Sequence, residues 1–306
     1  MIATTSMLSP EGLLEHVNTM CYPKWSSICL LKYLGLTTLR TGIITPDEPA
    51  RRIPSTIRSF GRENLKRQVM IRSDATTETK RYYRGGNSFP IAEAIHETEF
   101  LHGIGRAVLF MEPTNRFNNR LNVNIVMDRS EGMLLEVLGP GYDCSDLNRG
   151  DITPELSVKC PILDWPSFEL PRSWDFEIRR HNSQHERKRR KQLRLARLAN
   201  DVLPNLGLIH NASAMETRQW LLDREYTGLW KETDVELSLW DLYIYCKAAF
   251  EIANFFWERP WRVLGCSTSI LNDGRLIYWD IVCPTRKFGI DKYPLSNAAR
   301  LLALNP

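Results

Sequence analysis

Two basic residues in the first quarter of the chain are placed as phosphate ligands would be. Lys24 precedes an apolar helical pattern at 30–36, and Arg72 follows the run Val69 to Ile71, which predicts a short strand. At the exit of that strand the Arg72 guanidinium can face a cleft. A guanidinium binds phosphate through two parallel hydrogen bonds, whereas an ammonium binds it as a point charge. The two residues therefore indicate handling of a polyphosphate.

Glycines and a strand end supply further parts of such a site. Gly85 and Gly86 lie in a segment without apolar periodicity, predicted to be a loop, and their backbone N–H groups could contact phosphate oxygens. A strand predicted at 106–111 ends at Met111 and Glu112. Backbone at that end could meet an adenine edge, and Glu112 could bind ribose or simply cap the strand. These residues are candidate nucleotide contacts.

Two acidic residues are candidate Mg²⁺ ligands. Asp280 lies in an apolar strand pattern, where a carboxylate is rarely buried without a partner. Glu136 lies in the apolar run 133–138 and is either a ligand or a member of a buried ion pair. Mg²⁺ prefers oxygen ligands and bridges phosphates in nucleotide sites.

Apolar periodicity and turn residues predict the elements that position these side chains. Helices are expected at 30–36, from residue 53, and at 91–100, 187–203 and 239–257. Strands are expected at 42–45, 69–71, 106–111, 121–127, 133–138, 262–270 and 276–282. Asp273-Gly274 predicts a hairpin turn between the last two strands. The strands between 106 and 138 are expected to form one sheet.

Several of these motifs occur in an order that resembles the nucleotide-binding domain of pyruvate phosphate dikinase and phosphoenolpyruvate synthase, an ATP-grasp fold. The matching segments are Lys24, Leu34-Gly35-Leu36, Thr41 to Thr45, Ile71 to Ala75, Ala107 to Glu112, Glu136 to Pro154 and Asp273 to Asp280. The chain departs from the family at three places. Tyr22-Pro23 replaces a Gly-Gly pair, no acidic residue lies at 264–267, and Asp280 and Val282 replace Gln and Arg.

The resemblance implies an α+β, ATP-grasp-like protein of two lobes with the nucleotide between them. It implies an N-terminal lobe at 1–105, with Lys24 and Arg72 as catalytic residues. A C-terminal lobe is expected at 106–306, with a basic helical insertion at about 175–205. ATP and Mg²⁺ are the implied cofactors, and ATP-dependent phosphoryl transfer or ligation to an unknown acceptor is the implied activity.

Composition and charge narrow the classes of protein further. The 306 residues carry a formal net charge of +4, and no apolar run approaches the roughly 20 residues of a membrane helix. The first 20 residues lack the features of a secretory signal, so a cytoplasmic protein without a membrane partner is expected. Seven cysteines without CxxC spacing argue against a disulfide framework or a structural zinc site.

Basic residues are concentrated in one segment. Nine Lys or Arg and one Glu lie between Arg179 and Arg197, which is more positive charge than solubility requires. The part from Arg187 to Arg197 is therefore a candidate surface for nucleic acid or another acidic partner. An alternative function follows, namely a catalytically silent nucleotide sensor or nucleic-acid-binding protein that retains the fold.

Overall fold

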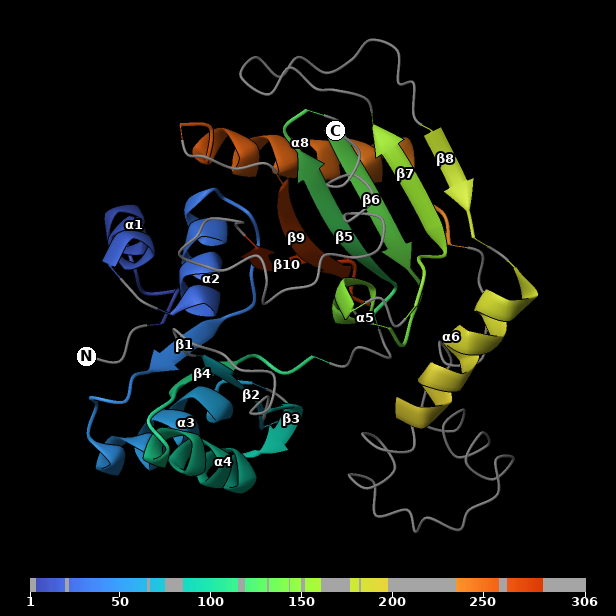
Figure 1. Cartoon of the computed structure of the whole chain (residues 1–306). Coiled ribbons are helices and arrows are strands. Elements are labelled where there is room, and N and C mark those ends of the chain that lie inside the picture. The colour runs from blue at the N-terminus through green and yellow to red at the C-terminus, as the bar shows by residue number, and fades with distance from the viewer. Residues whose placement is uncertain are drawn as a thin grey trace. The chain divides into compact units, whose positions relative to one another are not determined.

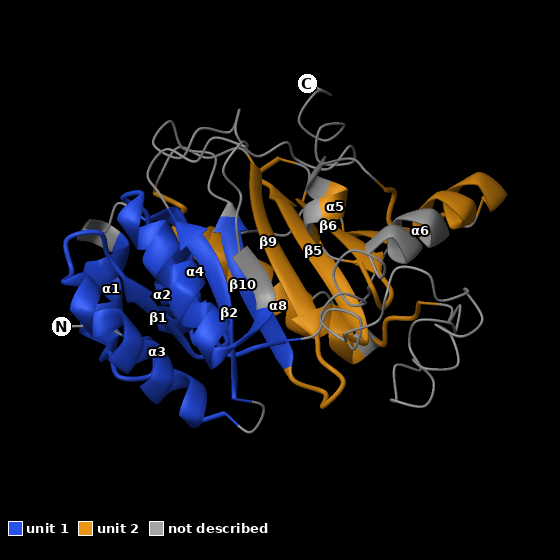
Figure 2. Cartoon of the chain, turned by 90° about the horizontal axis from the view of Figure 1, so that it is seen from below, with its two compact units in different colours: residues 1–115, 276–292 blue, residues 116–275, 293–306 orange. Residues whose placement is uncertain are grey.

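The computed structural model forms two compact units (Figure 2). Unit 1 comprises residues 1–115 and 276–292, and unit 2 comprises residues 116–275 and 293–306. The structure describes residues 4–19, 22–64, 67–74, 85–114, 119–130, 132–142, 144–149, 152–160, 177–181, 183–197, 235–258 and 263–282. In this part of the chain no helix is long and apolar enough to cross a membrane.

Unit 1 is built on a four-stranded antiparallel sheet with the order β1-β4-β2-β3 (Figure 1). The strands are β1 (Thr41–Ile44), β2 (Gln68–Asp74), β3 (Gly85–Pro90) and β4 (Ala107–Met111). The helical elements are α1 (Pro10–Thr19), α2 (Pro23–Tyr33), the 3-10 turn η1 (Ala50–Arg52), α3 (Ile53–Arg62) and α4 (Ile91–Gly103). A strand from late in the chain, β10 (Leu276–Val282), also belongs to this unit.

The core of unit 1 lies between its sheet and the helices α3 and α4. Ile53, Ile57 and Phe60 are spaced three or four residues apart, so they share one face of α3, and all three are buried. They pack with buried strand residues, and the rings of Phe60 and Phe110 meet edge to face at 4.9 Å. Burial of this face holds α3 against the sheet that carries Arg72.

Unit 2 contains an antiparallel arrangement of five strands in the order β9-β5-β6-β7-β8. The strands are β5 (Leu121–Asp128), β6 (Gly132–Leu138), β7 (Leu156–Cys160), β8 (Glu177–Arg180) and β9 (Val263–Ile270). The helices are α5 (Cys144–Arg149), α6 (Gln184–Arg197) and α8 (Leu239–Phe255). Every residue of β5 and β6 is buried, so these two strands form the centre of the unit.

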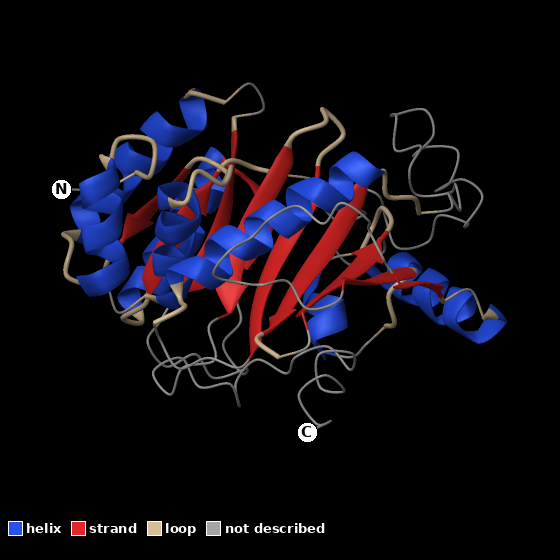
Figure 3. Cartoon of the chain, turned by 90° about the horizontal axis from the view of Figure 1, so that it is seen from above, coloured by secondary structure: helices blue, strands red, loops and turns tan. Residues whose placement is uncertain are grey.

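The long helix α8 crosses the strands of this sheet (Figure 3). It begins with a capping box, in which Ser238 accepts from the backbone N–H of Asp241 and the Asp241 carboxylate accepts from the backbone N–H of Ser238. Small buried residues, Ala248, Ala249 and Ala253, allow its backbone to approach other parts of the unit closely.

The α+β class predicted from the sequence is confirmed, and so are most of the predicted elements. The hairpin turn is also confirmed, with Gly274 at φ 84°. One expectation about the sheets was wrong. Strand β4 lies between β1 and β2 and not in one sheet with β5 and β6, because its apolar residues face the α3 and α4 core. The sequence patterns also missed α1, α5, β3, β7 and β8, which are short or carry few apolar residues.

Candidate functional site

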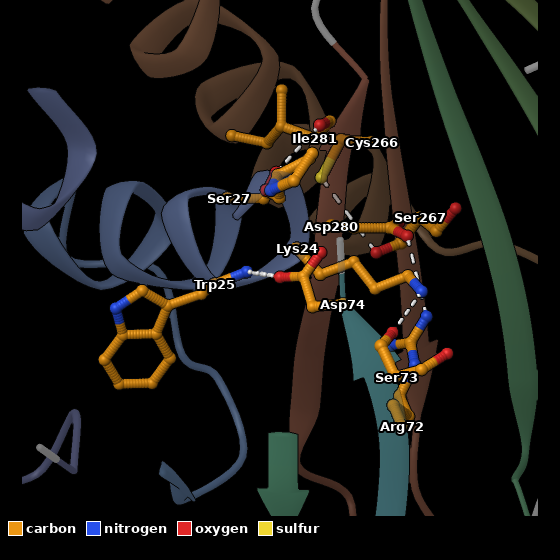
Figure 4. A network of polar contacts seen from close by, with 11 residues as sticks. Lys24, Trp25, Ser27, Arg72, Ser73, Asp74, Cys266, Ser267, Asp280 and Ile281 are labelled. Carbon is orange, nitrogen blue, oxygen red and sulfur yellow. Dashed lines mark hydrogen bonds and ion pairs between the residues drawn. The ribbon is translucent and has the colours of Figure 1, made fainter. Parts of the chain in front are cut away.

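Strand β2 carries three consecutive polar residues, Arg72, Ser73 and Asp74, at its C-terminal end. Arg72 lies inside the strand and not beyond it, opposite Gly85 of β3 and Leu109 of β4. The prediction of a strand end at Ile71 was therefore wrong, because the ladder with β4 continues through Asp74. Each of the three residues reaches another element of unit 1 (Figure 4).

Asp74 caps helix α2 from outside the helix. The Asp74 Oδ2 atom accepts a hydrogen bond of 2.9 Å from the backbone N–H of Trp25. Tyr22, which precedes the helix, provides no side-chain cap. The carboxylate therefore satisfies an N–H of the first turn that has no partner within the helix, and its charge is favourable at the positive end of the helix dipole.

Lys24 also lies in the first turn of α2, and its side chain is 5% exposed. Its Nζ atom donates a hydrogen bond of 2.6 Å to the backbone carbonyl of Ser73 (Figure 4). The ammonium therefore links α2 to β2. This contact gives Lys24 a structural role that the sequence did not predict, while its predicted contact with phosphate stays a prediction.

Arg72 and Asp280 form the most accessible charged pair of this cluster. The Arg72 Nη2 atom lies 4.0 Å from Asp280 Oδ2, and the two side chains are 23% and 29% exposed. Asp280 is held in place because its strand, β10, is fixed to the α2 region. Tyr278 N–H donates to the Thr37 carbonyl at 2.9 Å, and Ser27 Oγ donates to the Ile281 carbonyl at 2.9 Å.

These contacts bring together three predicted site residues, Lys24, Arg72 and Asp280, from three segments of unit 1. We call the residues Lys24, Arg72, Ser73, Asp74 and Asp280 the β2 cluster. Lys24, Ser73 and Asp74 build the junction between α2 and β2, and Arg72 and Asp280 offer one positive and one negative group to a ligand.

Gly85 and Gly86 are strand residues. They open β3 and lie opposite Arg72 and Ile71 of β2. The prediction that they belong to a loop was wrong, because the pairing with β2 orders a segment that has no apolar periodicity of its own. Gly85 is nevertheless the direct cross-strand neighbour of Arg72, so it lies beside the β2 cluster.

Met111 and Glu112 lie at the end of β4, as predicted. Met111 is buried and lies opposite Thr41 and Met70 of the flanking strands. The backbone N–H of Glu112 donates to the carbonyl of Arg40 at 3.0 Å. Contact of this segment with adenosine stays a prediction.

Glu136 lies in unit 2, in a row of polar residues that crosses the sheet. Glu136 is fully buried, and its Oε2 atom accepts a hydrogen bond of 2.9 Å from the amide of Asn124. The strand register places Ser267, Asn124, Glu136 and Ser157 directly opposite one another, and paired residues share a face. Ser157 Oγ lies 3.0 Å from His181 Nε2.

The Asn124 amide, which donates to Glu136, is a neutral group. The sequence predicted that Asn122 and Asn124 share one face of β5. It did not identify Asn124 as a partner of Glu136. Within the residues that the structure describes, no group of three or more His, Cys, Asp or Glu residues could hold a metal ion.

The comparisons with known proteins concern the fold alone. No protein-family model and no curated protein matches the chain. Among solved structures, D-cycloserine synthetase DcsG is similar with a TM-score of 0.39 and 8% identity, over 90% of this chain and 65% of that one. The ATP-grasp ligase PsnB, complexed with minimal precursor, has a TM-score of 0.35 and 10% identity, over 95% and 60%. PH1788 from Pyrococcus horikoshii has a TM-score of 0.40 and 8% identity, over 90% and 99%.

The similar solved structures thus include an ATP-grasp ligase. The chain spans 65% and 60% of the length of the first two structures. The similarity therefore concerns the fold and not the activities of those longer proteins.

Proposed function

We propose that the chain binds ATP with Mg²⁺ at the β2 cluster and uses it for phosphoryl transfer or ligation, as an ATP-grasp enzyme. The proposal rests mainly on the pair of Arg72 and Asp280. Their charged atoms lie 4.0 Å apart, although the two residues are about 200 positions apart in the sequence. The motif order that resembles the nucleotide-binding domain of pyruvate phosphate dikinase also supports it.

The charges of the pair suit a metal nucleotide. Arg72 would bind phosphate oxygens through its guanidinium, and Asp280 would bind the metal. A separation of 4.0 Å is the upper limit of an ion pair, and both side chains are partly exposed, so each can exchange its partner for a ligand. Mg²⁺ is commonly held by one or two carboxylates together with substrate phosphates, which a single Asp280 fits.

The remaining candidates have supporting roles in this proposal. Lys24 holds the carbonyl of Ser73 and so positions the strand that carries Arg72. Gly85, beside Arg72, leaves room for phosphate because it has no side chain. Gly86, Met111 and Glu112 would border the nucleotide. Glu136, which lies in unit 2, stays a predicted metal ligand. Bound ATP would supply the transferable phosphoryl group, and Mg²⁺ would neutralise its charge.

Calorimetric titration with ATP, with and without Mg²⁺, tests the proposal. A charged hydrogen bond to phosphate contributes about 1.5–3 kcal/mol, so Arg72→Ala should weaken ATP binding roughly 10- to 150-fold. Asp280→Asn should remove most of the dependence on Mg²⁺. Arg275→Ala is the matched control, because Arg275 is exposed and its guanidinium pairs with the neighbouring Asp273 in a turn. Unchanged ATP affinity in Arg72→Ala would refute the assignment.

A silent nucleotide sensor is the second candidate function. The engagement of the Lys24 ammonium with the Ser73 carbonyl favours it, because a catalytic lysine would have to exchange that contact for a phosphate. ATP binding that is sensitive to Arg72→Ala, with no consumption of ATP in the presence of any acceptor class tested, would select this candidate over the enzyme.

A further inference from the structure

We propose that the first turns of helix α6 carry a binding surface for the phosphodiester backbone of a nucleic acid. The surface consists of Arg187, Lys188 and Arg189, which are all exposed. It lies in unit 2 and does not depend on the proposed ATP site. Three observations support it. Arg190 anchors the helix, the side chain of Glu186 is engaged by Thr153, and the segment 187–197 carries only positive charges.

Arg190 anchors α6 to the body of unit 2. Its side chain is 4% exposed, although it belongs to the predicted basic face. The guanidinium donates to the carbonyl of His181 at 3.2 Å through both Nη atoms, and to that of Pro154 at 3.4 Å. The prediction that the whole run from Arg187 to Arg197 is a binding face was therefore wrong at Arg190, which is a structural residue.

A second contact fixes the start of the helix. Glu186 is the only acidic residue between Arg179 and Arg197, and its carboxylate accepts a hydrogen bond of 2.6 Å from Thr153 Oγ1. The backbone N–H of Glu186 is capped by Ser183 Oγ at 3.2 Å. The carboxylate of Glu186 is thus directed at the residue 153 segment, while the three exposed cations lie on a helix that these contacts hold in place.

The sequence continues this positive charge to the end of the helix. From residue 187 to 197 there are seven Lys or Arg and no acidic residue. The side chains beyond Arg190 lie outside the described residues, so the proposal rests on Arg187, Lys188 and Arg189.

The charge of the exposed side chains on α6 is complementary to a phosphodiester backbone. Two of the three exposed cations, Arg187 and Arg189, are arginine, whose planar group binds phosphate through two hydrogen bonds. Each phosphate that such a cation neutralises releases counterions, which favours binding at low salt. The shared chemistry is the phosphodiester backbone, which RNA or DNA could provide.

Fluorescence anisotropy with the full chain tests the surface. The probes are a labelled 20-nucleotide poly(U) and a labelled 20-base-pair DNA duplex, each titrated at several salt concentrations. The triple variant Arg187→Gln, Lys188→Gln, Arg189→Gln keeps Arg190 and therefore the anchor of the helix. Loss of three phosphate contacts, at about 0.7 each for a single strand, should lower the salt slope of binding by about 2 and weaken binding at least about tenfold at low salt.

The matched control is Arg51→Gln, Arg52→Gln, Arg62→Gln, which removes three exposed cations from unit 1. Both triple variants lower the formal net charge from +4 to +1. The proposal expects binding to be retained in the control and lost in the α6 variant, with unchanged circular dichroism in both.

Three outcomes would overturn the proposal. Equal loss in both variants would show that only net charge matters. Equal competition by polyglutamate would show a general acidic-protein surface. Binding to phosphatidylserine vesicles without binding to either nucleic acid would show a membrane surface. A preference between the two probes would identify the source of the phosphodiester backbone.

Discussion

The Asp74 carboxylate is the group on which the junction of β2 with α2 depends most directly. It is fully buried and accepts from the backbone N–H of Trp25 at 2.9 Å. Replacing a capping side chain by Ala costs about 1 kcal/mol and up to 2, and a hydrogen bond to a charged group contributes about 1.5–3 kcal/mol. These ranges describe the same contact, so Asp74→Ala should lower the free energy of unfolding by about 2 kcal/mol.

Asp74→Asn separates the hydrogen bond from the charge. The amide oxygen can still accept from Trp25, while the interaction of the carboxylate with the helix dipole, about 0.3–1 kcal/mol, is lost. We therefore expect the order of stability to be wild type, then Asp74→Asn, then Asp74→Ala. Glu93→Ala is the control, because Glu93 is an exposed acid in the first turn of α4 and its loss should change stability by about 0.5 kcal/mol or less.

Urea denaturation of the three variants measures these differences, provided that the m-value stays constant. Amide hydrogen exchange adds a local readout, since the N–H of Trp25 should lose protection in Asp74→Ala beyond the global change in stability. If Asp74→Ala is as stable as Glu93→Ala and the Trp25 amide keeps its protection, the carboxylate does not cap α2 and the reasoning is wrong.

Two further predictions concern the packing of unit 1. Gly42→Ala should cost about 1–3 kcal/mol in urea denaturation, because a Cβ there would overlap the buried Phe110 ring, while Gly103→Ala, with open space around it, should be nearly neutral. Burial lowers the pKa of His16, whose Nδ1 accepts from Trp25 Nε1 at 3.2 Å, so its contribution to stability is present above about pH 6.5 and is lost as the pH falls through the lowered pKa. The stability difference between wild type and His16→Gln should therefore shrink below pH 6.5, and a constant difference would contradict this.

The sequence by itself determined most of the elements, because apolar periodicity reports which face of a helix or strand is buried. The run from Leu239 predicted α8, and the alternation at 121–127 predicted β5 with its asparagines on one face. The sequence also singled out Lys24, Arg72 and Asp280. Local spacing carries this information because each element repeats with its own period.

Only the tertiary structure decided what those residues contact. Lys24 binds a backbone carbonyl, and Arg190 is a buried residue of α6, although the sequence suggests that both are exposed cations. Arg72 meets Asp280 because β2 and β10 are brought together by contacts with α2, not by any local pattern. In the sequence Asp74 is only part of a motif, yet it caps a helix that begins 51 residues earlier. Such long-range partners depend on how the strands are ordered, and periodicity along one element contains no information about its neighbours.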